Sequence, residues 1–202
     1  SPYTVLTGLF NLSMFTMHGA IYLNLKTEGA LQNQVQGWIR TAYIIFIIMF
    51  VATTGYTLLL RPEMLANFSF GKIESVGTYH ALVAEHQTAI SVIAWTIVLL
   101  NILSIANIPR TLAKEKPMQT FISSACTITA IIGLFALGIF PNMMVSSMAP
   151  EYSLDIYNGA STEYTLRTMF FVAIWGMPFV IGYTSLIYWT YRGKTRLTDS
   201  SY

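Results

Sequence analysis

The sequence predicts an all-α protein, an integral membrane helical bundle with five transmembrane helices. Only 10% of its 202 residues are charged, against roughly 25% in an average soluble domain. Apolar and aromatic residues make up 54% of the chain, and its mean hydropathy is +0.55. The 11 basic and 9 acidic side chains are too few to cover a soluble globule of this size. The composition therefore excludes a soluble domain. A net charge of +2 without any basic run argues against nucleic acid as a partner.

Five apolar stretches are long enough to cross the hydrocarbon core of a bilayer, which needs about 20 helical residues. They cover Tyr3–Leu25, Arg40–Leu60, Gln87–Ile108, Met118–Phe140 and Thr168–Tyr191. Helices are expected, because an open strand edge would leave backbone groups unpaired in lipid. Residues that commonly end helices follow the first four stretches, namely Gly29, Pro62, Pro109 and Pro141. Pro178 lies inside the fifth stretch and predicts a kink there.

The first stretch is the least apolar of the five, and its polar residues fall on one helix face. Thr4, Thr7, Asn11, His18 and Tyr22 recur at steps of three, four or seven residues. Such a face favours contact with another helix, a water-filled path or a partner subunit over contact with lipid. His18 is the only ionisable side chain deep inside any stretch. It is a candidate proton relay, haem ligand or quinol contact. The alternative is a neutral imidazole that hydrogen-bonds across a helix pair.

The remaining chemistry-bearing side chains predict no catalytic residue and no metal site in this chain. His80 and His86 are six residues apart and do not share a helix face, so they make a poor metal pair. Cys126 is the only cysteine, which rules out a disulfide within the chain. We interpret it as a small buried apolar side chain. The sequence contains no Ser–His–Asp set, phosphate-binding loop or pair of catalytic carboxylates.

The Lys and Arg residues are unevenly divided between the two sides of the five stretches. The richer side holds Lys26, Arg40, Arg110, Lys114, Lys116, Arg192, Lys194 and Arg196, whereas the other holds Arg61, Lys72 and Arg167. Because basic residues concentrate on the cytoplasmic side of membrane proteins, the richer side is predicted to be cytoplasmic. The C-terminus then lies inside the cell and Ser1 lies outside.

Two motifs resemble a known family. Residues 17–29 read MHGAIYLNLKTEG, and residues 153–161 read SLDIYNGAS and follow Phe140-Pro141. These runs resemble the HGAxYLxxKTEG and FP…SLTIYNASS signatures of subunit II of cytochrome bd-type quinol oxidases. Asp155 stands where Thr is common in the family, and Gly159 stands where Ala is common. The two motifs lie in the family's order, so the resemblance covers nearly the whole chain.

The resemblance implies a haem-free subunit of a terminal oxidase that oxidises quinol and reduces dioxygen to water in the respiratory chain. It implies a multi-pass protein of the bacterial inner membrane, packed on a haem-bearing subunit I that holds haems b and d. It also implies that this chain helps form the access of oxygen and protons to those haems. Further candidate partners are a small accessory membrane peptide, membrane lipid and a structural quinone. The candidates for the subunit interface or a proton path are His18, Asn11, Tyr22, Lys26 and Glu28.

The chain resembles about spans four to eight of that family. On this basis residues 1–36 are expected to be the last helix of an N-terminal bundle, and residues 37–202 a C-terminal four-helix transmembrane bundle. An alternative function is half of a membrane transporter or channel, with His18 and Asn11 at a site near the membrane midplane. A third interpretation is an assembly or anchoring protein, which would not need the polar face of the first stretch.

Overall fold

The computed structural model describes residues 1–70, 80–146, 148–149 and 152–194, without the side chains of residues 62–63 and 80–85. The described residues form five α-helices, one 3-10 helix and a two-stranded sheet. They fall into two compact units, divided between Pro141 and Asn142. The predicted boundary between residues 36 and 37 lies within one long helix, and that division of the chain stays a prediction.

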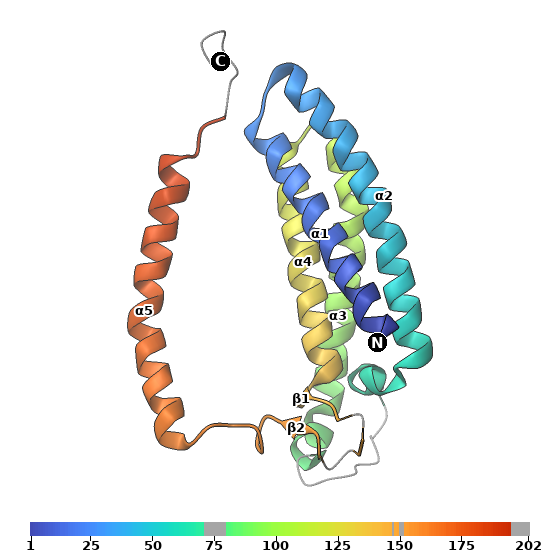
Figure 1. Cartoon of the computed structure of the whole chain (residues 1–202), viewed down its shortest axis with the longest axis vertical. Helices are drawn as coiled ribbons and strands as arrows, with labels where there is room; N and C mark the ends of the chain where they lie inside the picture. Colours follow the sequence, from blue (N-terminus) through green and yellow to red (C-terminus); the bar gives the residue numbers. More distant parts are fainter. Residues whose placement is uncertain (71–79, 147, 150–151, 195–202) are drawn as a thin grey trace. The chain divides into compact units, whose positions relative to one another are not determined.

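The first unit is a bundle of four α-helices (Figure 1). In chain order these are α1 (Pro2–Lys26), α2 (Gly29–Leu60), α3 (His80–Ala113) and α4 (Pro117–Ile139), with the 3-10 helix η1 (Pro62–Phe68) between α2 and α3. Helix α1 packs along α2, α3 packs along α4, and α1 also contacts α4. The bundle is therefore built from two helical hairpins that are joined side by side.

Four helices among the described residues are long and apolar enough to cross a membrane: Gly29–Leu60, His86–Ala113, Pro117–Ile139 and Glu163–Thr190. This confirms an all-α membrane bundle. Helix α1 has 25 residues, which is sufficient length, but it is not among the four. Its threonines and asparagines lower its hydropathy, so the fifth predicted crossing stays a prediction.

The contact between α1 and α2 is lined by large apolar side chains, and we call it the apolar seam. Its fully buried members are Met14, Met17, Ile21, Val35, Ile39 and Phe46, and Phe10 is 6% exposed. The rings of Phe10 and Phe46 stack with centroids 5.8 Å apart. With Ala42, which is 9% exposed, successive members of each helix are three or four residues apart, the spacing that keeps a contact line facing its partner along two antiparallel helices.

The contact between α3 and α4 has a different chemistry, and we call it the polar seam. Its members are Asn101, Asn107, Thr111, Thr120, Ser123, Ser124 and Thr127, of which only Asn107 is not buried. Asn107 Nδ2 donates to Ser123 Oγ at 2.8 Å, and Thr120 Oγ1 donates to Thr111 Oγ1 at 3.0 Å. Small polar side chains allow close approach of helices and hydrogen-bond across them, which is how helices associate in lipid.

The segment between the first and second predicted spans is mostly helix. Only Thr27 and Glu28 separate α1 from α2, and Gly29 begins α2 at φ +67°, a left-handed conformation that glycine tolerates. Val35 then enters the apolar seam well before the predicted start of the span at Arg40. Apolar length predicts only the part of a helix that crosses the bilayer. It does not predict the polar turns that extend the helix outside the membrane.

Pro109 does not end α3, contrary to the prediction, because α3 continues to Ala113. A proline inside a helix has no N–H for the carbonyl four residues earlier, here that of Ile105. The hydroxyl of Tyr43 on α2 donates to this Ile105 carbonyl at 3.2 Å. A side chain from the neighbouring helix thus replaces the missing backbone donor, which is how transmembrane helices tolerate proline. Pro62 and Pro141, by contrast, do follow helix ends as predicted.

Cys126 is exposed, so its interpretation as a buried side chain is wrong. Helix α4 buries the face that carries Thr120, Ser123, Ser124 and Thr127. Cys126 lies on the opposite face, where an apolar environment would come from outside this bundle. The apolar character of the stretch did not reveal which side of the helix faces its neighbours.

The second unit contains a short hairpin and the last long helix. Strands β1 (Asn142–Met144) and β2 (Leu154–Asp155) lie next to each other (Figure 1). They pair antiparallel, with Asn142 opposite Asp155. This hairpin was not expected from the sequence. Helix α5 (Glu163–Thr190) begins at the N-cap Thr162, whose hydroxyl accepts from the Thr165 N–H at 3.4 Å. Pro178 lies inside α5, and the kink that it predicts stays a prediction.

Candidate functional site

The polar face of α1 meets α4 at His18. His18 Nδ1 lies 2.8 Å from Ser124 Oγ, and the Ser124 hydroxyl donates to the Phe121 carbonyl, also at 2.8 Å. The imidazole stacks on the Phe121 ring with centroids 5.0 Å apart and an interplanar angle of 30°. One turn of α4 therefore holds the ring of His18 both by hydrogen bonding and by stacking.

The bond between Ser124 and the Phe121 carbonyl bears on the tautomer of a neutral His18. The Ser124 hydroxyl has one hydrogen, which it gives to the Phe121 carbonyl. When the hydroxyl keeps this bond, its oxygen accepts from the imidazole, and the proton of a neutral ring is then on Nδ1. Nε2 is left as an acceptor with a lone pair. The ring can take up a proton at Nε2 without losing its bond to Ser124.

Tyr22 and Lys26 continue the line from His18 toward the end of α1. The Tyr22 ring lies 5.9 Å from that of Phe121, and Lys26 Nζ lies 5.9 Å from the centroid of the Tyr22 ring. The three residues are four apart in sequence, so they rise by about 6 Å per step along one face. His18, Tyr22 and Lys26 form the polar line of the site. It runs about 12 Å from the middle of α1 to its end.

The other two sequence candidates lie outside this cluster. Asn11 is exposed, about two turns before His18 on the same face of α1. Glu28 is half-buried at the N-cap position of α2 and makes no side-chain capping bond. Thr4 is exposed, whereas the half-buried Thr7 donates to the Tyr3 carbonyl at 2.8 Å. The structure thus brings together His18, Tyr22 and Lys26 and leaves Asn11 on an open part of the same face.

Sequence reasoning missed the residues of α4 that hold His18. Ser124 and Phe121 belong to the fourth apolar stretch, whose interpretation rested on its length and its cysteine. A signal was available, because Thr120, Ser123, Ser124 and Thr127 repeat at helical spacing in that stretch. A polar repeat inside a membrane span indicates a helix contact.

A second polar cluster was also missed, at the end of the bundle where η1 lies. Asn67 Nδ2 donates to the carbonyls of Leu137, at 2.7 Å, and Phe140. Gln87 Nε2 donates to the Ala66 carbonyl at 3.2 Å, and Ser91 Oγ donates to the Ser69 carbonyl at 2.6 Å. Asn67, Gln87 and Ser91 are at most 3% exposed. They fasten η1 across the ends of α3 and α4, a structural role.

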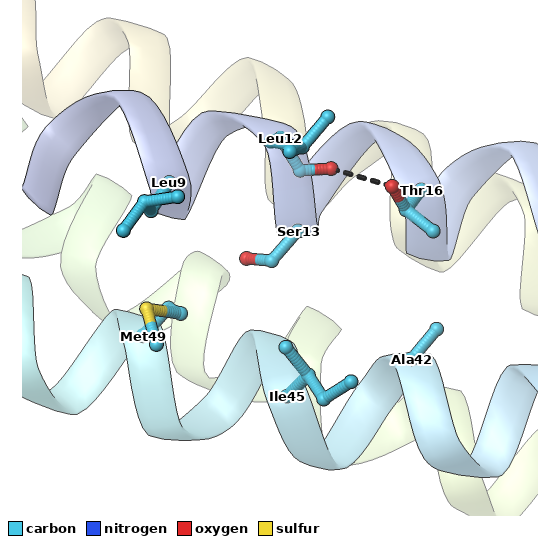
Figure 2. A pocket seen from close by; sticks show the side chains of 7 residues that line it. All are labelled: Leu9, Leu12, Ser13, Thr16, Ala42, Ile45 and Met49. Atoms are coloured by element: carbon cyan, nitrogen blue, oxygen red, sulfur yellow. Dashed lines mark hydrogen bonds between the residues drawn. The ribbon is translucent and has the colours of Figure 1, made fainter. Parts of the chain in front are cut away.

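An open groove of about 250 Å³ lies between α1 and α2. Figure 2 shows its lining, which is Leu9, Leu12, Ser13, Thr16, Ala42, Ile45 and Met49. The two hydroxyls in it donate to their own helix, Ser13 to the Phe10 carbonyl and Thr16 to the Leu12 carbonyl, both at 2.7 Å. The groove therefore offers apolar contact. It is smaller than typical small-molecule pockets of about 300–1,000 Å³, which suits a segment of a chain rather than a polar head group.

Within the part of the chain that the structure describes, no three His, Cys, Asp or Glu side chains come together as a metal site would require. His86 lies exposed near the start of α3, and the side chain of His80 is outside the described residues. His18, Tyr22 and Lys26 give the site side chains that can exchange protons and form hydrogen bonds.

Comparison with known proteins identifies similar chains. A family model described as "Cytochrome bd terminal oxidase subunit II" matches residues 1–191. The chain is 24% identical over 207 residues to "Cytochrome bd-I ubiquinol oxidase subunit 2" of Escherichia coli, covering 98% of this chain and 54% of that protein. It is 25% identical over 192 residues to "Cytochrome bd ubiquinol oxidase subunit 2" of Bacillus subtilis, covering 95% of this chain and 50% of that protein. The chain thus spans about half the length of the curated relatives that it matches.

Proposed function

This chain belongs to the family of cytochrome bd terminal oxidase subunit II, and we propose that it acts as the haem-free subunit of a quinol oxidase that reduces dioxygen to water. The observation that carries this proposal is the family match over residues 1–191. The four long apolar helices agree with it, since they make the chain a multi-pass membrane protein. We place it in the bacterial inner membrane with its C-terminus in the cytoplasm, as the distribution of Lys and Arg predicts.

The partner in this proposal is a haem-bearing subunit I that packs on the open part of the polar face of α1. Asn11 supports this assignment, because an amide that faces lipid is costly and one that faces another helix gains a hydrogen bond. Asn11 and Thr4 are exposed, whereas His18 and Tyr22 on the same face are already covered by α4. A small accessory membrane peptide is a further partner of the same kind.

The role of His18, Tyr22 and Lys26 is to pass protons toward the haems of the partner. Nε2 of His18 is available as an acceptor, and Lys26 stands at the predicted cytoplasmic end of the line. Steps of about 6 Å exceed hydrogen-bond length, so water must bridge them. Glu28, two residues after Lys26, adds a carboxylate at the predicted cytoplasmic end. Oxygen access would use the apolar surfaces of the same helices.

The placement of His18 supports a subunit that ligates no haem. A haem ligand presents its nitrogen to an iron within a porphyrin-sized space. The His18 ring is instead stacked on Phe121 within a helix contact. The residues around it do not fit a haem, and haems b and d belong to the partner in this proposal.

The groove between α1 and α2 fits the tail of a structural quinone or the acyl chain of a lipid. Leu9, Leu12, Ile45 and Met49 would hold an isoprenoid or acyl segment by apolar contact. A bound quinone would supply redox chemistry through its head group. None of these lining residues offers a charged group to that head, so it would lie beyond the groove.

The test is to purify the full-length protein with and without its co-expressed partner and to record reduced-minus-oxidised spectra. We expect haem bands only in the complex. Stoichiometric haem in the isolated protein would contradict the proposal. If the protein were half of a transporter, paired helices that unwind at a midplane site would be expected. Helices α3 and α5 instead continue as helix through Pro109 and Pro178. This difference favours the oxidase subunit.

A further inference from the structure

The connection between α4 and α5 carries large apolar side chains on its outside. Six residues of the β1–β2 hairpin form what we call the hairpin surface: Met143, Met144, Val145, Met148, Leu154 and Tyr157. Their exposed fractions run from 46% for Leu154 to 88% for Met148. Large exposed apolar side chains gathered in one short segment indicate a contact surface.

The covalent chain holds this hairpin close to a bilayer. Strand β1 begins at Asn142, only a few residues after α4 ends at Ile139. Three extended residues reach about 10 Å at most. The head-group region on each side of the hydrocarbon core is roughly 5–8 Å thick. Because α4 is long and apolar enough to span the core, the start of the hairpin lies in or directly beside that region.

Several polar groups in the described part of the hairpin are hydrogen-bonded within it. The Asp155 Oδ1 atom accepts from the backbone N–H groups of Tyr157 and Asn158, both at 2.7 Å. Asn158 Oδ1 accepts from the Asp155 N–H at 2.7 Å, and Asn158 Nδ2 donates to the Ser153 carbonyl at 2.9 Å. Ser153 Oγ accepts from the Ser146 N–H at 3.0 Å. Polar groups that are paired in this way can enter a poorly hydrated region at low cost.

Gly159 allows this loop to close tightly. Its N–H donates to the Asp155 carbonyl at 3.0 Å, and a Cβ on residue 159 would come within 2.9 Å of that carbonyl oxygen. The close approach of the two backbones fixes the turn after β2. Leu154 and Tyr157 are therefore presented by a tight turn.

The charges of this segment favour apolar contact over electrostatic binding. Residues 142–160 contain no Lys or Arg, and their two acidic residues are Glu151 and Asp155. Anionic phosphate groups are normally attracted by basic clusters, which are missing from this segment. Tyrosine is instead a residue type that settles at membrane interfaces, and Tyr152 and Tyr157 are both exposed.

We propose that the hairpin surface inserts into the head-group region of the leaflet where α4 and α5 emerge. The lipid interface is the partner of this surface, because the short covalent link to α4 keeps the hairpin beside the bilayer. Methionine side chains also adapt to an irregular apolar environment. The insertion would fix the emerging end of α5 to the bilayer. It does not depend on the oxidase function proposed above.

The test uses nitroxide labels on the purified complex in phosphatidylcholine nanodiscs. Cys126→Ser removes the only cysteine of this chain. Met148→Cys and Met144→Cys then place a label on the hairpin surface. Ser161→Cys is the matched control, since Ser161 is an exposed polar residue of the same connection. Collision of each label with oxygen, which partitions into lipid, is compared with collision with a water-soluble nickel chelate.

We expect the ratio of oxygen to nickel collisions to be several-fold higher at residues 144 and 148 than at residue 161. Equal ratios would show that the hairpin surface faces water, and would overturn the proposal. Labels protected from both reagents would show that protein covers the surface, which would also overturn it. If either methionine variant fails to assemble, Leu154→Cys on the same surface takes its place.

Discussion

The two helical hairpins of the bundle differ in the side chains that fill the contact between their helices. Between α1 and α2 lie Met14, Met17, Ile39 and Phe46, whereas threonines, serines and asparagines lie between α3 and α4. In water the first contact would be far stronger, because it buries apolar surface. In lipid that advantage is largely lost, and shape and hydrogen bonds decide. Either chemistry can therefore keep two membrane helices together, but only the polar seam also binds the imidazole of His18.

The largest expected effect tests the apolar seam. Phe46→Ala removes a fully buried ring that stacks on Phe10 and on Phe50. Truncations of this kind cost about 3–5 kcal/mol in soluble cores. We expect about 3 kcal/mol here, because lipid solvates the separated helices. Chemical unfolding in mixed micelles measures the loss. A cost below that of removing one polar-seam hydroxyl would mean that packing does not hold α1 to α2.

The next effect tests the contact between the two hairpins. Tyr43→Phe leaves the Ile105 carbonyl without a donor, at an expected cost of about 1–2 kcal/mol. Pro109→Ala restores the backbone N–H that should serve the same carbonyl. In the Pro109→Ala background, Tyr43→Phe should therefore cost little. An equal cost in both backgrounds, measured by the same unfolding assay, would show that the tyrosine acts by packing alone.

The third effect concerns the place where the polar seam meets α1. His18→Ala should reduce assembly of the complex modestly, and it should reduce oxygen consumption per haem further if His18 passes protons. Ser124→Ala keeps the ring and removes only the bond to Nδ1, so its effect on turnover per haem should be smaller. The readouts are haem content and oxygen uptake with quinol. Unchanged turnover per haem in His18→Ala would show that His18 acts only in packing.

The smallest effect comes from one hydroxyl pair within the polar seam. Thr120→Val and Thr111→Val each remove one partner of a buried 3.0 Å hydrogen bond. A double-mutant cycle should give a coupling of about 0.6 kcal/mol, as is typical between membrane helices. A coupling of several kcal/mol would mean that hydrogen bonds dominate the polar seam. No coupling would leave close approach of small side chains as its only stabilising term.

The sequence predicts the helices well and their neighbours poorly. Apolar length locates α2 to α5, because the bilayer imposes it on each span separately. The continuation of α3 past Pro109 depends on Tyr43, far away in the chain, and no local rule contains that contact. The same limit applies to the site. Periodicity places His18, Tyr22 and Asn11 on one face, but only the fold shows that Ser124 and Phe121 cover the first two residues.

The exposure of Cys126 is a second case in which the sequence does not identify the neighbours of a helix. In a soluble protein an apolar stretch predicts burial, whereas a membrane helix is apolar toward lipid as well as toward its neighbours. Within α4 the buried face carries the polar residues Thr120, Ser123, Ser124 and Thr127. For spans of this kind, small polar side chains are the better guide to the interior.

The most direct test of the account is quinol-dependent oxygen consumption by the complex purified through a tag on the full-length protein. We expect the preparation to contain a haem-bearing partner and to consume oxygen when quinol is added. We also expect both the partner and the activity to decrease when Asn11, on the open face of α1, is replaced by a bulky Trp, but not when exposed Cys126 is replaced by Ser. A preparation that contains no haem-bearing partner and consumes no oxygen with quinol would contradict the assignment of this chain to a working oxidase.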